Sequence, residues 1–406
     1  MTTLSSTAPS IWKNHAFSVL FSTALFADFS GKIYDLALPL LVFDLTHSSQ
    51  WMGWMRAVEF LPNLLLALFI GVWVDKSDKK RWSQWMLIGQ FTTLITAYLA
   101  VEHLAKPLVV LFPCAFLMMA FNYGYQNARM SILKHALPQQ MQNLATARIS
   151  SLYSIMETIG PVLSGAILML SAIHHVFVLC AALLLLSFWR LHRLSYQENA
   201  AILSNQKAPV LKQIAQGWQL WYQEKNMRLI TYAVMVINTT GAVFWIQAIY
   251  FAKADLALDS LQVSYLVAAS GIGGLLGAFS AEKIRAKIGL GRLLIGSIVL
   301  ESLGFLFPAL YSHLFALAAS LFWISSIGLY SNICIWSYRQ EAFESQHIGK
   351  VAGITGSLFK LLMPFGLAAS GYLVSDLGLT SVFITCCVVQ LLTGLTLCFT
   401  RVAKIA

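Results

Sequence analysis

The sequence has 406 residues, of which 58% are hydrophobic and only 11% are charged, and its formal net charge is +10. Soluble domains contain about 25% charged and about 45–50% apolar residues, so this composition excludes an ordinary soluble protein. Most charged residues stand between apolar runs of roughly 20 residues, the length of a helix that crosses ~30 Å of hydrocarbon. The composition therefore predicts an all-α membrane protein that crosses the bilayer many times.

The hydropathy pattern predicts twelve transmembrane helices. In chain order, the predicted spans are residues 16–43, 50–74, 83–103, 107–133, 141–169, 172–191, 228–252, 260–281, 291–311, 314–338, 348–374 and 378–400. The longest polar stretch separates the sixth span from the seventh. We therefore divide the chain into two pseudo-symmetric six-helix halves, 1–191 and 228–406, joined by a cytoplasmic linker at 192–227.

The lysines and arginines predict the orientation of the chain in the membrane. They gather near the N-terminus and in every second loop after it, whereas the intervening loops hold only Lys106 and Lys253. By the positive-inside rule, this asymmetry places both termini in the cytoplasm. The positive net charge is thus a signal of topology, and it predicts no nucleic-acid partner. The first span is expected to direct the chain to the membrane, since no cleavable leader is evident.

Two further features have simple structural interpretations. From Val210 to Trp221, apolar residues recur at helical spacing, which predicts an amphipathic linker helix on the inner membrane surface. The six cysteines all fall within apolar spans and are interpreted as small core residues. No metal-ligand spacing appears, so we expect neither a bound metal nor a cofactor.

Span 1 carries three charged residues on one face, Asp28, Lys32 and Asp35, with the lysine able to pair with either aspartate. A charge near the bilayer centre costs at least ~2.5–3.5 kcal/mol, so this face is expected to line a cavity or a protein-buried surface. We expect the two aspartates to take part in proton coupling and Lys32 to contact substrate. A closed structural triad is the alternative.

Span 2 repeats this pattern with Arg56 and Glu59. Arg56 and Asp35 both fall in the outer third of their spans, so an ion pair between them is expected. Glu59, and Glu157 in span 5, are further candidates for proton coupling, and Arg56 is a candidate for substrate binding. A purely structural ion pair is the alternative for Arg56.

Amides and aromatic rings on several spans suit an amphipathic organic ligand. The candidate substrate-binding residues of this kind are Asn122, Tyr123, Gln126, Asn238, Trp245, Tyr330 and Asn332. Ordinary hydrogen bonds between helices are the alternative for each of them. Lys360 in span 11 is expected either to pair with a carboxylate, such as Glu59, or to bind an anionic substrate. Glu301 in span 9 receives no role.

Between spans 2 and 3 the chain reads Gly71-Val-Trp-Val-Asp75-Lys76-Ser-Asp-Lys-Lys-Arg81. A glycine one turn before an acid, followed by a basic cluster, resembles the signature loop of major facilitator superfamily transporters. In span 5, Gly160-Pro161 resembles the glycine–proline motif of drug antiporters in that superfamily. Small residues of span 8, including Gly274 and Gly277, are expected to pack closely against span 5.

The resemblance covers essentially the whole chain and implies alternating access between two halves. It implies that Gly71, Asp75, Lys76 and Arg81 form a conformational gate, as do Gly160 and Pro161 with Gly274 and Gly277. It also implies that a glycine face of span 11, comprising Gly349, Gly353 and Gly356, meets span 2 near Gly71. Ser77-Asp78 departs from the family pattern, which more usually has a glycine there.

Within the superfamily, the chain is most similar to bacterial efflux proteins of the enterobactin-exporter type. This implies a monomer in the bacterial inner membrane that exports a siderophore or drug-like molecule in exchange for protons. Import of a siderophore or another anionic metal chelate is the alternative, and it would use the same cavity. A membrane enzyme or a non-transporting sensor is a third possibility, although no catalytic constellation or signalling domain is evident in the sequence.

Overall fold

The computed structural model describes residues 11–168, 172–195 and 210–405. Within these helices, the description does not extend to the surroundings of Gly71 or to some side chains, among them those of Asp75, Glu157 and Pro161. The described chain is helical throughout and contains no strand. The N-terminal half consists of η1 (Ile11–Lys13), α1 (His15–Thr46), α2 (Ser49–Leu65), α3 (Ala67–Lys76), α4 (Lys79–His103), α5 (Leu108–Ala136), α6 (Gln139–Leu168), η2 (Ile173–His175) and α7 (Val176–His192).

The linker and the C-terminal half follow the same pattern of long helices joined by short turns. They consist of α9 (Val210–Gln223), α10 (Lys225–Ala254), α11 (Ser260–Ile288), α12 (Leu290–Gly304), α13 (Leu306–Leu310), α14 (Leu314–Ala342), α15 (Ser345–Leu358), α16 (Met363–Leu377), α17 (Leu379–Cys398) and η3 (Arg401–Lys404). Within the described residues, every predicted span overlaps one helix or two consecutive helices. Nine helical stretches of the described residues are long and apolar enough to cross a membrane.

Three predicted spans are broken in the structure. The second divides at Leu66, one turn after Pro62, and the ninth divides at Phe305. The eleventh divides between α15 and α16, where Pro364 stands in the first turn of α16. Proline cannot donate a backbone hydrogen bond but fits the first turn of a helix, which favours a break just before it. Lys360 lies in this last break.

Side-chain caps define several helix ends. The Asp78 carboxylate accepts a hydrogen bond from the backbone N–H of Arg81 at 2.9 Å and begins α4. The aspartate that departs from the family pattern is therefore the N-cap of this helix. Asp259 and Gln262 form a reciprocal capping box at the start of α11. Such caps satisfy backbone N–H groups that the helix itself leaves unbonded.

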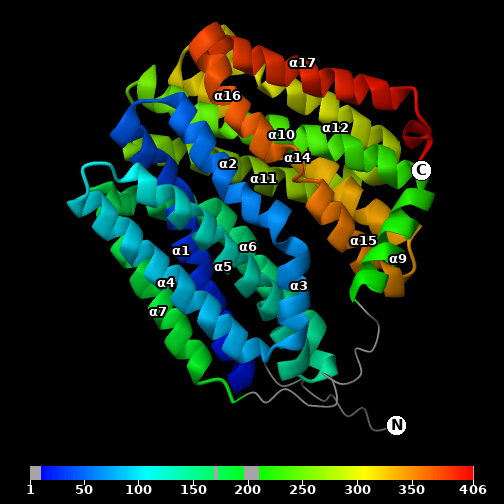
Figure 1. Ribbon diagram of the computed structural model, residues 1–406. Coiled ribbons are helices and arrows are strands. Elements are labelled where there is room, and N and C mark those ends of the chain that lie inside the picture. Colours follow the sequence, from blue (N-terminus) through cyan, green and yellow to red (C-terminus); the bar gives the residue numbers. More distant parts are fainter. Residues whose placement is uncertain (1–10, 169–171, 196–209, 406) are drawn as a thin grey trace, which may run out of the picture.

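The two halves form separate bundles that approach one another at one end (Figure 1). We call this the closed end; it carries the α1–α2 and α10–α11 turns. The opposite end, with the loop of Lys76 and Arg81, is called the basic end. At the closed end α2 packs against α16, and α6 packs against α11. The predicted contact between spans 5 and 8 is thus present in the structure.

The α2–α16 contact is a close approach of backbones. A methyl group on Gly53 would collide with the Leu367 carbonyl, and one on Gly371 would collide with the Gln50 backbone. Neutral hydrogen bonds surround these glycines. Trp54 Nε1 donates to Tyr372 Oη at 3.3 Å, and Gln50 Nε2 donates to Ser375 Oγ at 3.0 Å. The half-buried Lys253 and the exposed Asp44 add one ion pair at 3.8 Å.

Other glycines do not occupy the expected contacts. Gly273 and Gly277 face backbone carbonyls of α14, within their own half, and a methyl group on Gly274 would meet nothing within 4 Å. The expectation that this glycine run packs against span 5 is therefore wrong. Gly165 of α6 lies instead beside Ser264 of α11.

The glycine face of span 11 also lacks its expected partner. Methyl groups on Gly349, Gly353 or Gly356 would meet nothing within 4 Å. The predicted contact of this face with span 2 near Gly71 is thus wrong for this conformation, because α2 meets α16 at the closed end instead.

The predicted amphipathic linker helix is present as α9, which packs against α15. Lys350 Nζ donates to Gln216 Oε1 at 2.8 Å, and a methyl group on Gly217 would lie 2.9 Å from the Lys350 carbonyl. Trp221 Nε1 donates to Thr231 Oγ1 at 2.9 Å. These contacts attach α9 to the C-terminal half.

Candidate functional site

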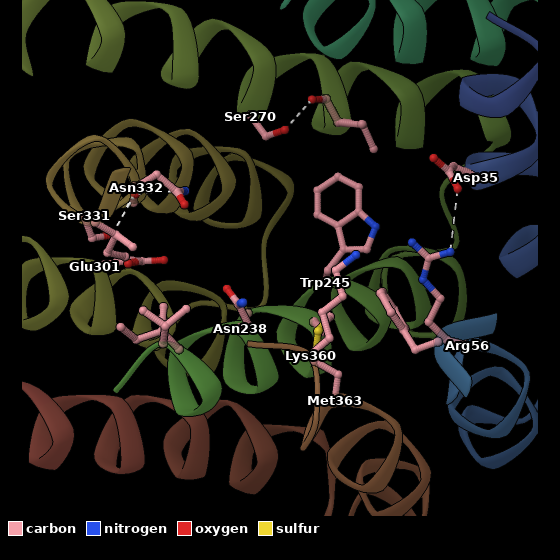
Figure 2. Close-up of a pocket in the computed structure, with 18 of the residues that line it drawn as sticks. Asp35, Arg56, Asn238, Trp245, Ser270, Glu301, Ser331, Asn332, Lys360 and Met363 are labelled. Carbon is pink, nitrogen blue, oxygen red and sulfur yellow. Dashed lines mark hydrogen bonds and ion pairs between the residues drawn. The ribbon is translucent and has the colours of Figure 1, made fainter. Parts of the chain in front are cut away.

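A cavity of about 540 Å³ lies between the two halves. Figure 2 shows side chains from both halves pointing into it. Its lining residues come from α1, α2, α10, α11, α12, α14, the break before α16, and α16; they are Lys32, Asp35, Leu36, Arg56, Phe60, Val234, Ile237, Asn238, Gly241, Ala242, Trp245, Val267, Ser270, Glu301, Gly328, Ser331, Asn332, Ile335, Lys360 and Met363. The volume suits a small organic ligand.

The N-terminal half contributes charges that neutralise one another. Asp35 lies 3.9 Å from the Lys32 ammonium and 3.8 Å from the Arg56 guanidinium. Arg56 also donates to Glu59 Oε2 at 2.9 Å. The predicted Asp35–Arg56 and Lys32–Asp35 pairs are thus confirmed. Glu59 is only 1% exposed and lies behind Arg56, outside the cavity lining.

The C-terminal half contributes two charged groups without opposite charges beside them. Glu301 is 6% exposed, and its Oε2 has no hydrogen-bond partner. Across the described residues, the Lys360 ammonium makes neither a hydrogen bond nor an ion pair. The expected pair between Lys360 and a carboxylate is therefore absent. Figure 2 shows both side chains at the cavity, Glu301 beside Asn332 and Lys360 beside Trp245.

The remaining lining is amphipathic. Trp245, Phe60 and Met363 supply apolar surface. Asn238 Nδ2 donates to the Phe359 carbonyl at 3.0 Å, which leaves its amide oxygen for a ligand. Asn332 Nδ2 lies 3.4 Å from the Gly328 carbonyl, a longer hydrogen bond. A few polar groups on an apolar wall are typical of small-molecule sites.

Several predicted substrate-binding residues lie away from the cavity. Gln126 Nε2 donates to Asp28 Oδ1 at 3.3 Å, within the N-terminal half. Tyr123 packs against an apolar cluster that includes Ile70 of α3. Asn122 is half-buried on α5, and it too is absent from the lining.

Tyr330 also lies outside the lining, although Asn332 of the same helix is part of it. The Tyr330 hydroxyl shares a hydrogen bond of 2.7 Å with Ser280 Oγ. This contact joins α14 to α11. Tyr330 therefore makes a hydrogen bond between helices in this structure, which is the alternative that the sequence left open.

Asp28, the first candidate for proton coupling, is buried in an ion pair. Arg129 Nη1 donates to both of its carboxylate oxygens at 2.9 Å. The two residues join α1 to α5 and do not line the cavity.

The predicted gate residues are distributed along the basic end, α6 and α11. Lys76 and Arg81 are exposed. Gly160 lies against the Lys32 side chain, and a methyl group added to this glycine would lie 3.1 Å from Lys32 Cγ. The surroundings of Gly71 and the side chains of Asp75, Glu157 and Pro161 lie outside the described part of the structure.

Sequence reasoning missed two important residues. Glu301 received no role, yet a lone acid inside an apolar span is costly and signals a function by itself. Arg129 follows Gln126 by three residues, so the sequence places this cation on the same face of span 4. Its pairing with Asp28 depends on how α1 and α5 pack, which the sequence pattern does not show.

Comparison with known proteins agrees with this architecture. The profile of the Major Facilitator Superfamily matches residues 20–366. The multidrug efflux pump Tap of Mycolicibacterium fortuitum is 25% identical, with 94% of each chain covered. Macrolide efflux protein A of Streptococcus pyogenes is 23% identical, covering 92% of this chain and 91% of its own. The staphyloferrin A transporter of Staphylococcus aureus is 27% identical over 38% of each chain.

Solved transporter structures share the fold. A bacterial homologue of the iron transporter ferroportin, in an inward-facing state, superposes with a TM-score of 0.71 at 13% identity, covering 95% of this chain and 99% of its own. The nucleoside transporter NupG superposes with a TM-score of 0.73 at 14% identity, covering 94% of this chain and 98% of its own. At these identities, the likeness concerns the fold alone.

Proposed function

The chain belongs to the Major Facilitator Superfamily, and we propose that it exports an amphipathic small organic molecule in exchange for protons. Family membership makes the protein a multi-pass membrane transporter of small molecules rather than an enzyme. The finer assignment rests above all on the cavity between the halves, which combines apolar and aromatic walls with two uncompensated charges. The two efflux relatives, which cover nearly the whole chain, support the direction.

The proposed proton-binding groups are Glu301 and Asp35. Both line the cavity, where a proton and a substrate can compete for the same space. Glu301 is buried and has no cation beside it, so it is costly to ionise, whereas a ligand cation or hydrogen-bond donor beside it favours the charged form. Asp35 is more exposed and lies 3.8–3.9 Å from Lys32 and Arg56, which makes it the second candidate. Binding of substrate then releases the proton, and the two binding events are linked. Asp28 is less suited in this conformation because it lies outside the cavity lining, where it is buried against Arg129 at 2.9 Å.

The proposed mechanism is alternating access with the basic end facing the cytoplasm. The positive-inside rule supports this orientation, which makes the closed end periplasmic and the cavity loadable from inside. Gly71, Asp75, Lys76 and Arg81 are proposed to close the basic end in the opposite state. Since one chain supplies both halves of the cavity, we propose that the transporter acts as a monomer in the bacterial inner membrane.

Import of an anionic metal chelate is the second candidate. The unpaired ammonium of Lys360 favours an anionic group in the ligand, and the partial match to the staphyloferrin A transporter is consistent with a chelate. This candidate uses the same cavity and differs in direction.

Transport in membrane vesicles of both orientations tests the proposal. Everted and right-side-out vesicles containing the full chain would receive an imposed pH gradient and a panel of labelled compounds: a cationic dye, a macrolide, and a tricarboxylate chelator with and without Fe³⁺. Export predicts accumulation in everted vesicles with an acidic interior, and its loss when a protonophore collapses the gradient. Accumulation in right-side-out vesicles alone would overturn the direction and favour import.

A further inference from the structure

Three metal-ligating side chains meet at the closed end, away from the cavity. Glu102 stands near the C-terminus of α4, and His174 and His175 form the end of η2. One ligand atom from each residue lies within 4.8 Å of the other two. The distance between His174 Nε2 and Glu102 Oε2 is 2.9 Å, and the two imidazole centroids are 4.4 Å apart.

The surrounding structure holds these side chains together. The Tyr98 ring, one turn before Glu102 on α4, lies 6.0 Å from each imidazole centroid and is stacked on that of His174. The His175 backbone N–H donates to the Ala172 carbonyl at 3.0 Å, which closes the turn that presents both histidines. The three side chains are thus held by regular backbone structure, the last turn of α4 and the turn of η2.

The donor set fits a divalent transition metal. Zn²⁺ binds imidazole nitrogen and carboxylate oxygen at about 2.0–2.2 Å, which places neighbouring ligand atoms about 3.3–3.5 Å apart in tetrahedral geometry. A separation of up to 4.8 Å therefore needs a contraction of about 1.3–1.5 Å at most. His175 and Glu102 are exposed and His174 is half-buried, so small side-chain rotations can supply it.

We propose that Glu102, His174 and His175 bind one Zn²⁺ ion or a similar divalent transition metal, with water in the open position. The ion would link the end of α4 to the turn that begins α7, both in the N-terminal half. Local sequence spacing could not reveal this site, because the glutamate and the first histidine are separated by 72 positions. The site is distinct from the cavity and does not depend on the proposed transport function.

Zn²⁺ titration of the purified full chain tests the site, using an affinity tag without histidine. Calorimetry is expected to show one ion per chain, and the melting temperature is expected to rise saturably with Zn²⁺. Glu102→Gln, His174→Gln and His175→Gln should each weaken binding more than about tenfold, because each removes one of only three protein ligands. His347→Gln is the matched control, since His347 also faces a glutamate, Glu344, at 3.9 Å.

Three results would overturn the proposal. They are no Zn²⁺ binding by the parent chain, unchanged binding in the three ligand variants, or an equal loss in His347→Gln. Melting curves recorded in a chelator identify any variant that fails to fold. If a variant does not fold, the parent chain alone provides a second measurement, its absorption spectrum with bound Co²⁺. A tetrahedral histidine site gives intense visible bands, whereas a Glu102–His174 hydrogen bond without metal gives none.

Discussion

Arg129 binds both carboxylate oxygens of Asp28 through a single nitrogen, at 2.9 Å each, and thereby fixes α1 to α5. Both side chains are more than nine-tenths buried. Removing one partner of such a pair leaves the other charge uncompensated, at a cost of about 3–5 kcal/mol. Asp28 therefore has a structural role in this conformation, and its contribution to transport has to be separated from its contribution to stability.

A double-mutant cycle makes that separation. Arg129→Met should lower the free energy of unfolding by about 3–5 kcal/mol, because it strands the Asp28 carboxylate. The double variant Asp28→Leu/Arg129→Met should recover most of this loss, since neither charge remains. Thermal or denaturant unfolding in detergent measures both. If the double variant transports like the parent, Asp28 has no part in proton coupling; equal destabilisation of single and double variants would contradict the structural role.

Glu301→Gln should uncouple transport from the proton gradient. The amide keeps the shape of the side chain but cannot release a proton, so substrate binding should persist. For one-to-one exchange, a pH difference of one unit across the membrane can support about a tenfold ratio of substrate concentration inside to outside. In the variant this ratio should fall to about one. Vesicle accumulation and equilibrium binding are the two measurements.

The matched control is Glu341→Gln, which removes a carboxylate from an ion pair with Arg285 at the basic end, outside the cavity. It should keep its gradient-driven accumulation. Full accumulation by Glu301→Gln would instead assign the coupling to Asp35, the other carboxylate of the cavity lining.

Lys360→Met should leave stability within about 1 kcal/mol of the parent, because no pair is broken when an unpaired cation is removed. Affinity for an anionic substrate should fall about tenfold to hundredfold, the value of a charge-assisted hydrogen bond of about 1.5–3 kcal/mol. Affinity for neutral or cationic compounds should not fall. A large drop in melting temperature without substrate would indicate that Lys360 pairs with a carboxylate in another conformation.

Gly53→Val should force the closed end apart. Its side chain would collide with the Leu367 carbonyl, and overpacking of this kind costs about 1–3 kcal/mol. A cost of 1.4 kcal/mol shifts the ratio of closed to open forms about tenfold. Spin labels at exposed Leu45 and Leu377, in a cysteine-free background, should report longer distances. Gly353→Ala enters open space and should leave the distances unchanged.

Hydropathy alone predicts the course of the chain well, because each helix must satisfy its own backbone hydrogen bonds in lipid. Within the described residues, each of the twelve predicted ranges overlaps one helix or two consecutive helices. The breaks at Leu66 and Phe305 escaped prediction, since an apolar run has the same composition whether or not it bends. The gap before Pro364 could have been anticipated from the proline itself.

The site was predicted where partners are neighbours in sequence or at equal depth, as with Lys32, Asp35 and Arg56. It was not predicted where the rotation of a helix about its axis decides whether a side chain faces the cavity. Asn238 and Asn332 face the cavity, whereas Gln126, an equally plausible candidate from the sequence, donates a hydrogen bond to Asp28 within its own half. Depth along a span follows from counting residues, but the direction of a face requires knowledge of its neighbours.

The closed end has a consequence for the conditions under which the transporter can work. Its seam consists of backbone contacts and neutral hydrogen bonds such as Trp54–Tyr372, and its single ion pair in the described chain, Asp44–Lys253, has an exposed carboxylate. Salt screens exposed charges but hardly affects contacts of this kind. Opening and closing on this side should therefore be nearly independent of ionic strength, so a change of salt concentration at the closed end should leave the rate of transport almost unchanged.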